Sequence, residues 1–131
     1  MREYFKKHGV FSWNELMTSD VESAKKFYGE LFGWTFEASP SDCCETYHVA
    51  KAGDAPAAGL MALPPDVSSG GVPSHWGSYV TVDDLNLAAQ KTVELGGGII
   101  IPPREIPGMG SFSVIKDPQG AVICMFEYLK P

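Results

Sequence analysis

The chain has 131 residues, of which 44% are hydrophobic and 20% are charged. This length suits a single domain that buries about two thirds of its unfolded surface, and the composition excludes a disordered chain. The formal net charge is -6, with a pI near 4.9, which leaves no basic stripe to neutralise phosphates. We therefore expect no binding to nucleic acid or to a membrane, and a small-molecule ligand or substrate as the partner.

Cysteine usage and the first residues indicate the compartment. Two of the three cysteines, Cys43 and Cys44, are adjacent, which makes a poor disulfide framework. Residues 1–9 carry charge, and no apolar stretch of an export signal follows them. No apolar stretch approaches the roughly 18 residues that a transmembrane helix needs. These observations predict a cytoplasmic protein with free thiols.

The first half of the chain starts with a strand predicted at residues 10–17. A helix follows, capped by Asp20 itself or by Ser19 in a capping box with Glu22. Gly33 is a natural end for this helix. The apolar residues of the helix have helical spacing, and we expect their face to be buried against the sheet: Val21, Ala24, Phe27, Tyr28, Leu31 and Phe32.

The rest of the chain alternates short apolar runs with Gly and Pro, which is typical of strands and turns. A second helix begins at Asp83 or Asp84 and ends at Gly96 to Gly98, and its expected inner stripe is Leu85, Ala88, Ala89, Thr92, Val93 and Leu95. The other predicted strands cover residues 34–38, 45–51, 57–63, 75–82, 98–103, 111–116 and 120–128. Residues 65–73, rich in Pro, Gly and Ser, are expected to link the two halves.

The two halves also match each other in sequence. A constant shift of 63 residues aligns Trp13 with Trp76, and the same shift aligns Thr18 with Thr81 and Asp20 with Asp83. The glycines that end the two helices, Gly33 and Gly96, keep this offset. Each half therefore reads as a strand, a helix and three further strands.

Five segments carry a family resemblance: residues 13–16 with Asp20, then 27–34, 58–60, 79–83 and 117–121. In these segments the chain resembles the vicinal oxygen chelate superfamily, which includes glyoxalase I, extradiol dioxygenases, fosfomycin-resistance enzymes and bleomycin-binding proteins. The resemblance implies a single α+β domain, residues 1–131, in which two βαβββ modules form a curved mixed sheet around a cavity. The modules would cover about residues 8–64 and 74–131. It also implies a homodimer.

Metal-dependent members of that family hold a divalent ion with His, Gln or Glu from the first and last strands of the modules. The matching positions here lie near Trp13, Gly77 and Cys124, none of which is a usual ligand for such an ion. We therefore predict no metal site and no cofactor. The alternative is a metal-dependent lyase, isomerase or dioxygenase with ligands drawn from Glu15, Glu45, His48, His75 and Glu127.

An apolar pocket with a few polar anchors is the better-supported kind of site. Alternation along the first strand places Trp13 and Glu15 on one face, between Phe11 and Met17. Glu15 is either solvated at a dimer boundary or a pocket carboxylate with a raised pKa that acts as an acid or base. We take Glu15 as the candidate catalytic residue.

The other pocket residues are expected on the same family geometry, and the ligand-binding set is Trp13, Tyr47, His75, Tyr79, Arg104, Phe112, Cys124 and Phe126. The alternative is that the aromatic residues fill the core and that Cys124 is an inert thiol. Arg104, which follows Pro102 and Pro103, is expected on a loop that borders the cavity. It is either an arm for an anionic substrate or a solvated loop residue.

Three functions remain open on the sequence. The first is a metal-independent protein that binds a small hydrophobic or planar molecule between its modules, either sequestering it or moving a proton beside a substrate carbonyl with Glu15. The second is the metal-dependent enzyme of glyoxalase type. The third is an interaction module without catalysis, because one fold hosts unrelated functions.

Overall fold

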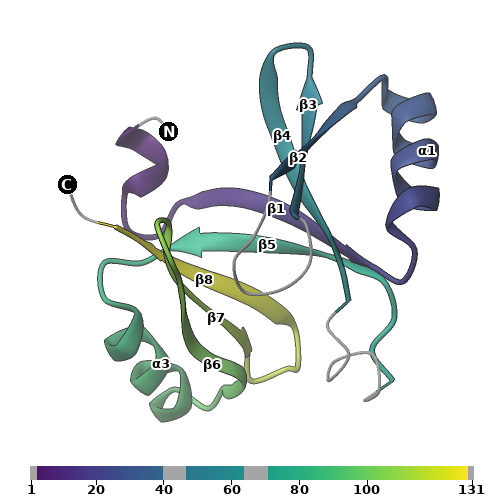
Figure 1. The fold of residues 1–131 in the computed structure, drawn as a ribbon. Coiled ribbons are helices and arrows are strands. Elements are labelled where there is room, and N and C mark those ends of the chain that lie inside the picture. Colours follow the sequence, from purple (N-terminus) through teal and green to yellow (C-terminus); the bar gives the residue numbers. More distant parts are fainter. Residues whose placement is uncertain (1–2, 40–46, 64–70, 130–131) are drawn as a thin grey trace. The chain divides into compact units, whose positions relative to one another are not determined.

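The computed structural model describes residues 3–39, 47–63 and 71–129, and it shows an α+β fold. A short 3-10 helix, η1 (Glu3–Lys6), precedes two successive βαβββ modules (Figure 1). The first module contains β1 (Phe11–Thr18), α1 (Val21–Phe32), β2 (Thr35–Ser39), β3 (Tyr47–Ala52) and β4 (Ala55–Ala62). The second contains β5 (His75–Thr81), α3 (Leu85–Glu94), β6 (Gly98–Ile106), β7 (Gly110–Lys116) and β8 (Val122–Tyr128). The predicted fold class is confirmed.

The described strands form a mixed open sheet in the order β2-β3-β4-β1-β5-β8-β7-β6. In the first module β1 is parallel to β4, and β3 pairs antiparallel with both β2 and β4. In the second module β5 is parallel to β8, and β7 pairs antiparallel with both β6 and β8. The sequence repeat at a shift of 63 residues is thus accompanied by a repeat of strand pairing.

The chain divides into two compact units, residues 14–76 and residues 1–13 together with 77–131. Residues 1–13 and 77–131 form unit 1, and residues 14–76 form unit 2. The division falls within β1 and β5, so the predicted boundaries of the modules and their linker stay predictions. Part of that linker, and the segment with Cys43, Cys44 and Glu45, lies outside the described residues.

Both helices begin at an aspartate that accepts a hydrogen bond from a backbone N–H three residues later. Asp20 caps α1 through the N–H of Ser23 at 3.0 Å, and Asp84 caps α3 through the N–H of Leu87 at 3.1 Å. The capping N–H and the hydroxyl of Ser23 stabilise the ionised carboxylate, so they lower the pKa of Asp20 below its usual value. The sequence allowed either of two residues to cap each helix. The structure shows that the caps are Asp20 and Asp84.

The apolar face of α1 is not buried as expected. No residue of this helix is buried, and Phe27, Leu31 and Phe32 are 59%, 58% and 57% exposed. The rings instead pack beside one another around Tyr28, whose ring lies 5.0 to 6.0 Å from those of Phe27, Phe32, Trp34 and Trp76. Helical spacing predicted an apolar face correctly, but spacing carries no information about what covers that face.

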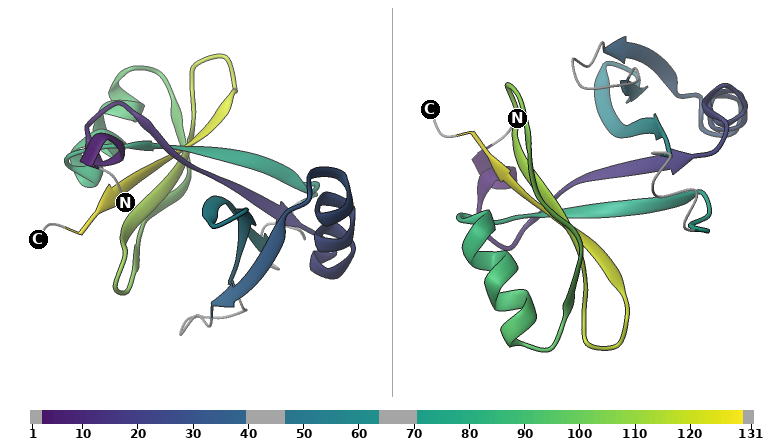
Figure 2. Two further views of the ribbon diagram at one scale, coloured as in Figure 1. Left: turned by 90° about the horizontal axis from the view of Figure 1, so that it is seen from above. Right: turned by 60° about the horizontal axis from the view of Figure 1, so that its bottom comes forward.

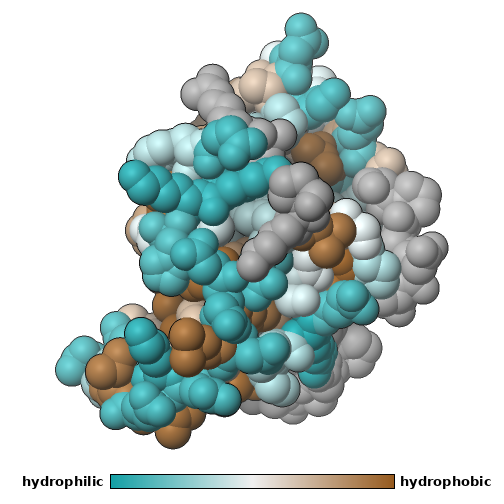
Figure 3. Space-filling model, turned by 90° about the vertical axis from the view of Figure 1, so that its left-hand side faces the viewer, coloured by the Kyte–Doolittle hydropathy of each residue, from teal (hydrophilic) through white to brown (hydrophobic). Residues whose placement is uncertain are grey.

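In unit 1, α3 contacts β6, β7 and β8 and lies along one side of these strands (Figures 1 and 2). Leu85 is only 2% exposed and packs in a cluster with Val82 and Met125. The predicted inner stripe is wrong at its end, because Val93 and Leu95 are 59% and 76% exposed. Hydrophobic side chains also reach the surface in the lower part of the face in Figure 3.

Candidate ligand-binding face

The side of the unit 1 sheet that faces away from α3 carries most of the predicted pocket. Direct partners in neighbouring strands point to the same side of a sheet. One row across the strands is Tyr79, Cys124, Val114 and Ile101, and the next is Thr81, Phe126, Phe112 and Arg104. These two rows are separated by two residues on β8, so they share one side, which we call the aromatic face.

The aromatic face is partly covered and partly open. Tyr79, Val114, Cys124 and Phe126 form its buried centre, and around them pack the half-buried residues Trp13, Ile101, Ile106, Phe112 and Tyr128. The ring centroids of Tyr79 and Phe126 are 6.1 Å apart, and those of Phe126 and Tyr128 are 4.5 Å apart. The structure thus brings together five predicted ligand-binding residues, namely Trp13, Tyr79, Phe112, Cys124 and Phe126.

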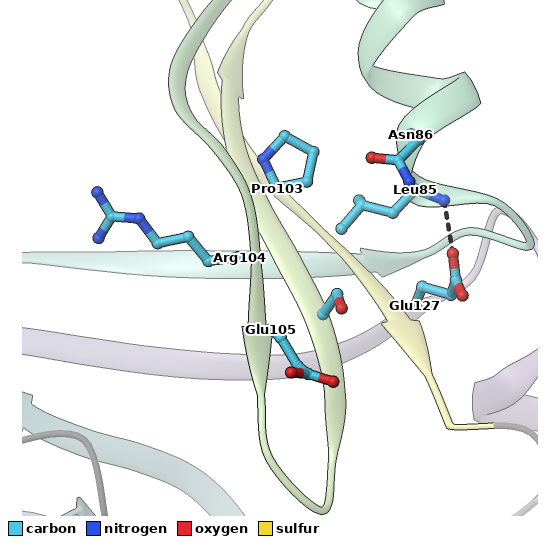
Figure 4. Close-up of a pocket in the computed structure, with 7 residues that line it drawn as sticks. Leu85, Asn86, Pro103, Arg104, Glu105 and Glu127 are labelled. Carbon is cyan, nitrogen blue, oxygen red and sulfur yellow. Dashed lines mark hydrogen bonds between the residues drawn. The ribbon is translucent and has the colours of Figure 1, made fainter.

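Arg104 is not on a loop, because β6 extends to Ile106 and includes it. Its direct partner across the ladder is Phe112, so its side chain starts on the aromatic face. Figure 4 agrees, since Arg104 extends away from Leu85 and Asn86, which lie on the α3 side. The predicted strand ended one residue earlier, at residue 103.

A polar cavity of about 250 Å³ lies on the opposite side of the same strands, next to the start of α3 (Figure 4). Its lining includes Glu127, whose carboxylate accepts a hydrogen bond of 2.7 Å from the backbone N–H of Leu85. Glu127 therefore completes the N-terminal turn of α3. Of the predicted ligand-binding residues only Arg104 lines this cavity, and its side chain leaves it, so this cavity is not the predicted pocket.

Unit 2 holds the remaining candidates. Glu15 is 7% exposed, and it lies opposite Gly59 of β4, which in turn pairs with Val49 of β3. Tyr47 is half-buried and two residues from Val49, so it shares the side of Glu15. His75 is half-buried at the start of β5, where its Nδ1 lies 2.9 Å from the carbonyl oxygen of Pro73.

The alternative metal ligands do not converge in the part of the chain that the structure describes. There, no three His, Cys, Asp or Glu side chains are grouped as metal ligands would be. His48 pairs with Leu60, which pairs with Leu16, so His48 lies on the other side of the unit 2 sheet from Glu15. Glu127 is engaged at α3, and Glu45 lies outside the described residues. The described residues therefore do not fit a divalent metal.

The sequence reasoning missed Tyr128, which lies on the aromatic face two residues after Phe126. Continuing the alternation of β8 by one step identifies it. Its hydroxyl donates a hydrogen bond of 2.9 Å to Ser12, a buried residue of β1. Burial raises the pKa of the Tyr128 phenol above its usual value, and the hydrogen bond with Ser12 opposes part of this effect.

This pKa shift predicts a loss of stability at alkaline pH. The fold favours the neutral phenol, whereas the unfolded chain ionises near pH 10, so the unfolded state releases its proton first. The free energy of unfolding should fall as the pH rises through about 10, and Tyr128→Phe should remove this component. At pH 8 the variant should lose about 1 kcal/mol with the hydrogen bond.

Urea denaturation between pH 8 and pH 11 measures both effects. Tyr4→Phe is the matched control, because Tyr4 is 63% exposed. An equal alkaline loss of stability in the wild type and in Tyr128→Phe would contradict the prediction.

Comparison with known proteins supplies the family. The sequence profile of the Glyoxalase/Bleomycin resistance protein/Dioxygenase superfamily matches residues 10–125. The chain belongs to this superfamily. It is also similar to "Putative glyoxylase CFP32" of Mycobacterium tuberculosis. The two sequences are 41% identical over 94% of this chain and 44% of that protein. The resemblance expected from the sequence is confirmed.

Two further comparisons concern a relative and a solved structure. The anthracycline biosynthesis protein DnrV of Streptomyces peucetius is 27% identical, over 91% of the chain and 47% of that protein. The crystal structure of methylmalonyl-CoA epimerase from Mycobacterium tuberculosis matches with a TM-score of 0.61 at 15% identity, covering 95% of this chain and 93% of that one. This last likeness concerns the fold alone. The glyoxalase-superfamily chain spans about half the length of the two curated relatives.

Proposed function

We propose that this protein binds a small hydrophobic or planar molecule on the aromatic face, without a metal ion. The observation that carries the proposal is the aromatic face itself, where half-buried rings surround a buried apolar centre on rigid neighbouring strands. Small-molecule sites are usually apolar surfaces with a few polar groups. Flat rings supply contact area with little loss of side-chain freedom on binding.

Gly77 adds to the case for a binding surface. It precedes Tyr79 by two residues on β5, and a Cβ atom built on it would lie 3.5 Å from the sulfur of Cys124. A side chain at position 77 would contact Cys124, and glycine makes no such contact. We propose that a ligand ring lies against Gly77, with Trp13 and Phe112 at its sides.

Catalysis by Glu15 is the enzymatic form of this proposal. Its carboxylate is buried on the unit 2 sheet, where it lies opposite a glycine. A buried carboxylate is a suitable acid or base for proton transfer beside a carbonyl group. The names of relatives, a glyoxylase and a protein of anthracycline biosynthesis, are compatible with such chemistry on a small molecule. Tyr47 and His75 remain ligand-binding proposals in the same unit.

The metal-dependent alternative is less well supported, because its proposed ligands are spread over both sides of the unit 2 sheet and the start of α3. Among the helices that the structure describes, none has the length and apolar character required to cross a membrane. Cytoplasmic location, homodimer formation and the absence of nucleic-acid binding stay predictions. We also propose no cofactor.

Binding of a flat neutral probe, 2-naphthamide, tests the proposal. Ligand-observed NMR should detect binding to the wild type, and Phe112→Ala should weaken it about tenfold, since an aromatic ring that contacts a ligand commonly contributes more than 1 kcal/mol. Phe27→Ala is the matched control, because it makes the same change at a residue that is 59% exposed and lies on α1 of unit 2, outside the aromatic face. Equal affinity for the wild type and Phe112→Ala would reject the aromatic face as the site.

A further inference from the structure

We propose that Arg104 makes the aromatic face selective for planar molecules that carry an anionic group, of which an aromatic carboxylate is the simplest. This inference rests on the proposed function, and it adds the charge of the ligand. It starts from the strand register around Arg104, which the sequence could not provide.

The pairing of β6 with β7 places Arg104 on the aromatic face. Ile101 lies opposite Val114, and Arg104 lies opposite Phe112. Ile101 and Arg104 differ by three positions on β6, whereas their partners Val114 and Phe112 differ by two on β7, so β6 carries one extra residue at Pro102 and Pro103. A second extra residue lies between Ile99 and Ile101, so the two insertions together leave Arg104 on the same side as Gly98, the partner of Lys116. Bulges are common next to functional sites.

The charge of Arg104 is not neutralised by a carboxylate in the part of the chain that the structure describes, where no ion pair includes it. Its neighbour Glu105 lies opposite Ser111, on the α3 side of the sheet. The chain as a whole is acidic, with a net charge of -6, so it does not attract anions in general. An anion bound here would be recognised locally.

The neighbours of Arg104 define the shape of the ligand. Its row continues through Phe112 and Phe126, so the guanidinium is carried at the edge of a run of rings. A guanidinium binds a carboxylate through two parallel hydrogen bonds. A molecule that places its ring on Phe112 and its carboxylate at Arg104 would satisfy both groups together.

Lys116 provides a matched control on the same strand. It lies four residues after Phe112 on a regular part of β7, so it also starts on the aromatic face, but roughly 13 Å further along. It pairs with Gly98 and Val122, at the opposite end from Arg104. Arg104→Gln and Lys116→Gln therefore remove the same charge from the same face at different places.

The experiment compares 2-naphthoate with its neutral counterpart 2-naphthamide by isothermal titration calorimetry at constant pH and salt. The wild type should bind 2-naphthoate about five to twenty times more tightly than the amide, since a charge-assisted hydrogen bond at an exposed site contributes this much. Arg104→Gln should lose the preference while keeping its affinity for the amide. Lys116→Gln should keep the preference, and Arg104→Lys should retain part of it.

The outcomes separate this inference from the function on which it rests. If both probes bind the wild type equally, or if the preference survives in Arg104→Gln or disappears in Lys116→Gln, anion recognition by Arg104 is overturned while the aromatic site stands. If neither probe binds, the aromatic site and the anion preference are both overturned.

Discussion

Replacing Gly110 with alanine is expected to lower the free energy of unfolding by about 3 to 5 kcal/mol, the largest effect we expect from removing or adding a single methyl group. Gly110 begins β7 with a φ of +148°, a conformation that residues with a side chain rarely adopt. A Cβ atom there would overlap the carbonyl oxygen of Glu127 and lie 2.9 Å from Cε1 of Phe126. Both the backbone of β8 and the aromatic face would have to shift.

Gly108→Ala is the control for this prediction. Gly108 also has a positive φ, +81°, but a Cβ atom there would meet nothing within 4 Å. The control should therefore cost only the conformational strain, about 1 kcal/mol. Chemical denaturation of both variants measures the difference, and similar losses in the two would show that the close approach of β7 and β8 at Gly110 is wrong.

Replacing Leu85 with alanine should lower the free energy of unfolding by about 3 kcal/mol, because it removes a buried side chain and leaves a cavity. Leu85 is the first residue of α3 and packs against Val82 and Met125 under the helix. The substitution leaves intact the hydrogen bond between its backbone N–H and Glu127. The loss should therefore reflect packing rather than capping.

Leu87→Ala, two residues along the same helix, makes the same chemical change at a side chain that is 49% exposed. We expect it to change stability by no more than about 0.5 kcal/mol. Thermal and urea denaturation of the pair should give clearly different midpoints. Equal effects would contradict the placement of α3 on the sheet of unit 1.

Much of the fold could be predicted because local patterns repeat. The match of Trp13 with Trp76 indicated two modules. The aspartates and glycines at the helix ends indicated where each helix begins and ends. Alternation within strands then grouped Cys124 with Phe126 correctly, since both residues belong to one strand and differ by two positions. Patterns that depend on a single element were therefore reliable.

What could not be predicted depends on neighbouring elements. The apolar face of α1 was expected to be buried, yet Phe27 and Phe32 are exposed, because helical spacing does not reveal the packing partner. Arg104 was expected on a loop, and only the pairing of β6 with β7 shows that it lies on a strand opposite Phe112. Strand register arises from pairing across the chain, which one sequence does not display.

NMR mapping would show whether the aromatic face of unit 1 is the ligand-binding site. Titration of ¹⁵N-labelled protein with 2-naphthamide would follow the backbone amide signals of the whole chain. We expect the largest shifts to cluster at Tyr79, Phe112, Cys124 and Phe126. Shifts confined to Leu85, Asn86 and Glu127, around the polar cavity at the start of α3, would contradict it.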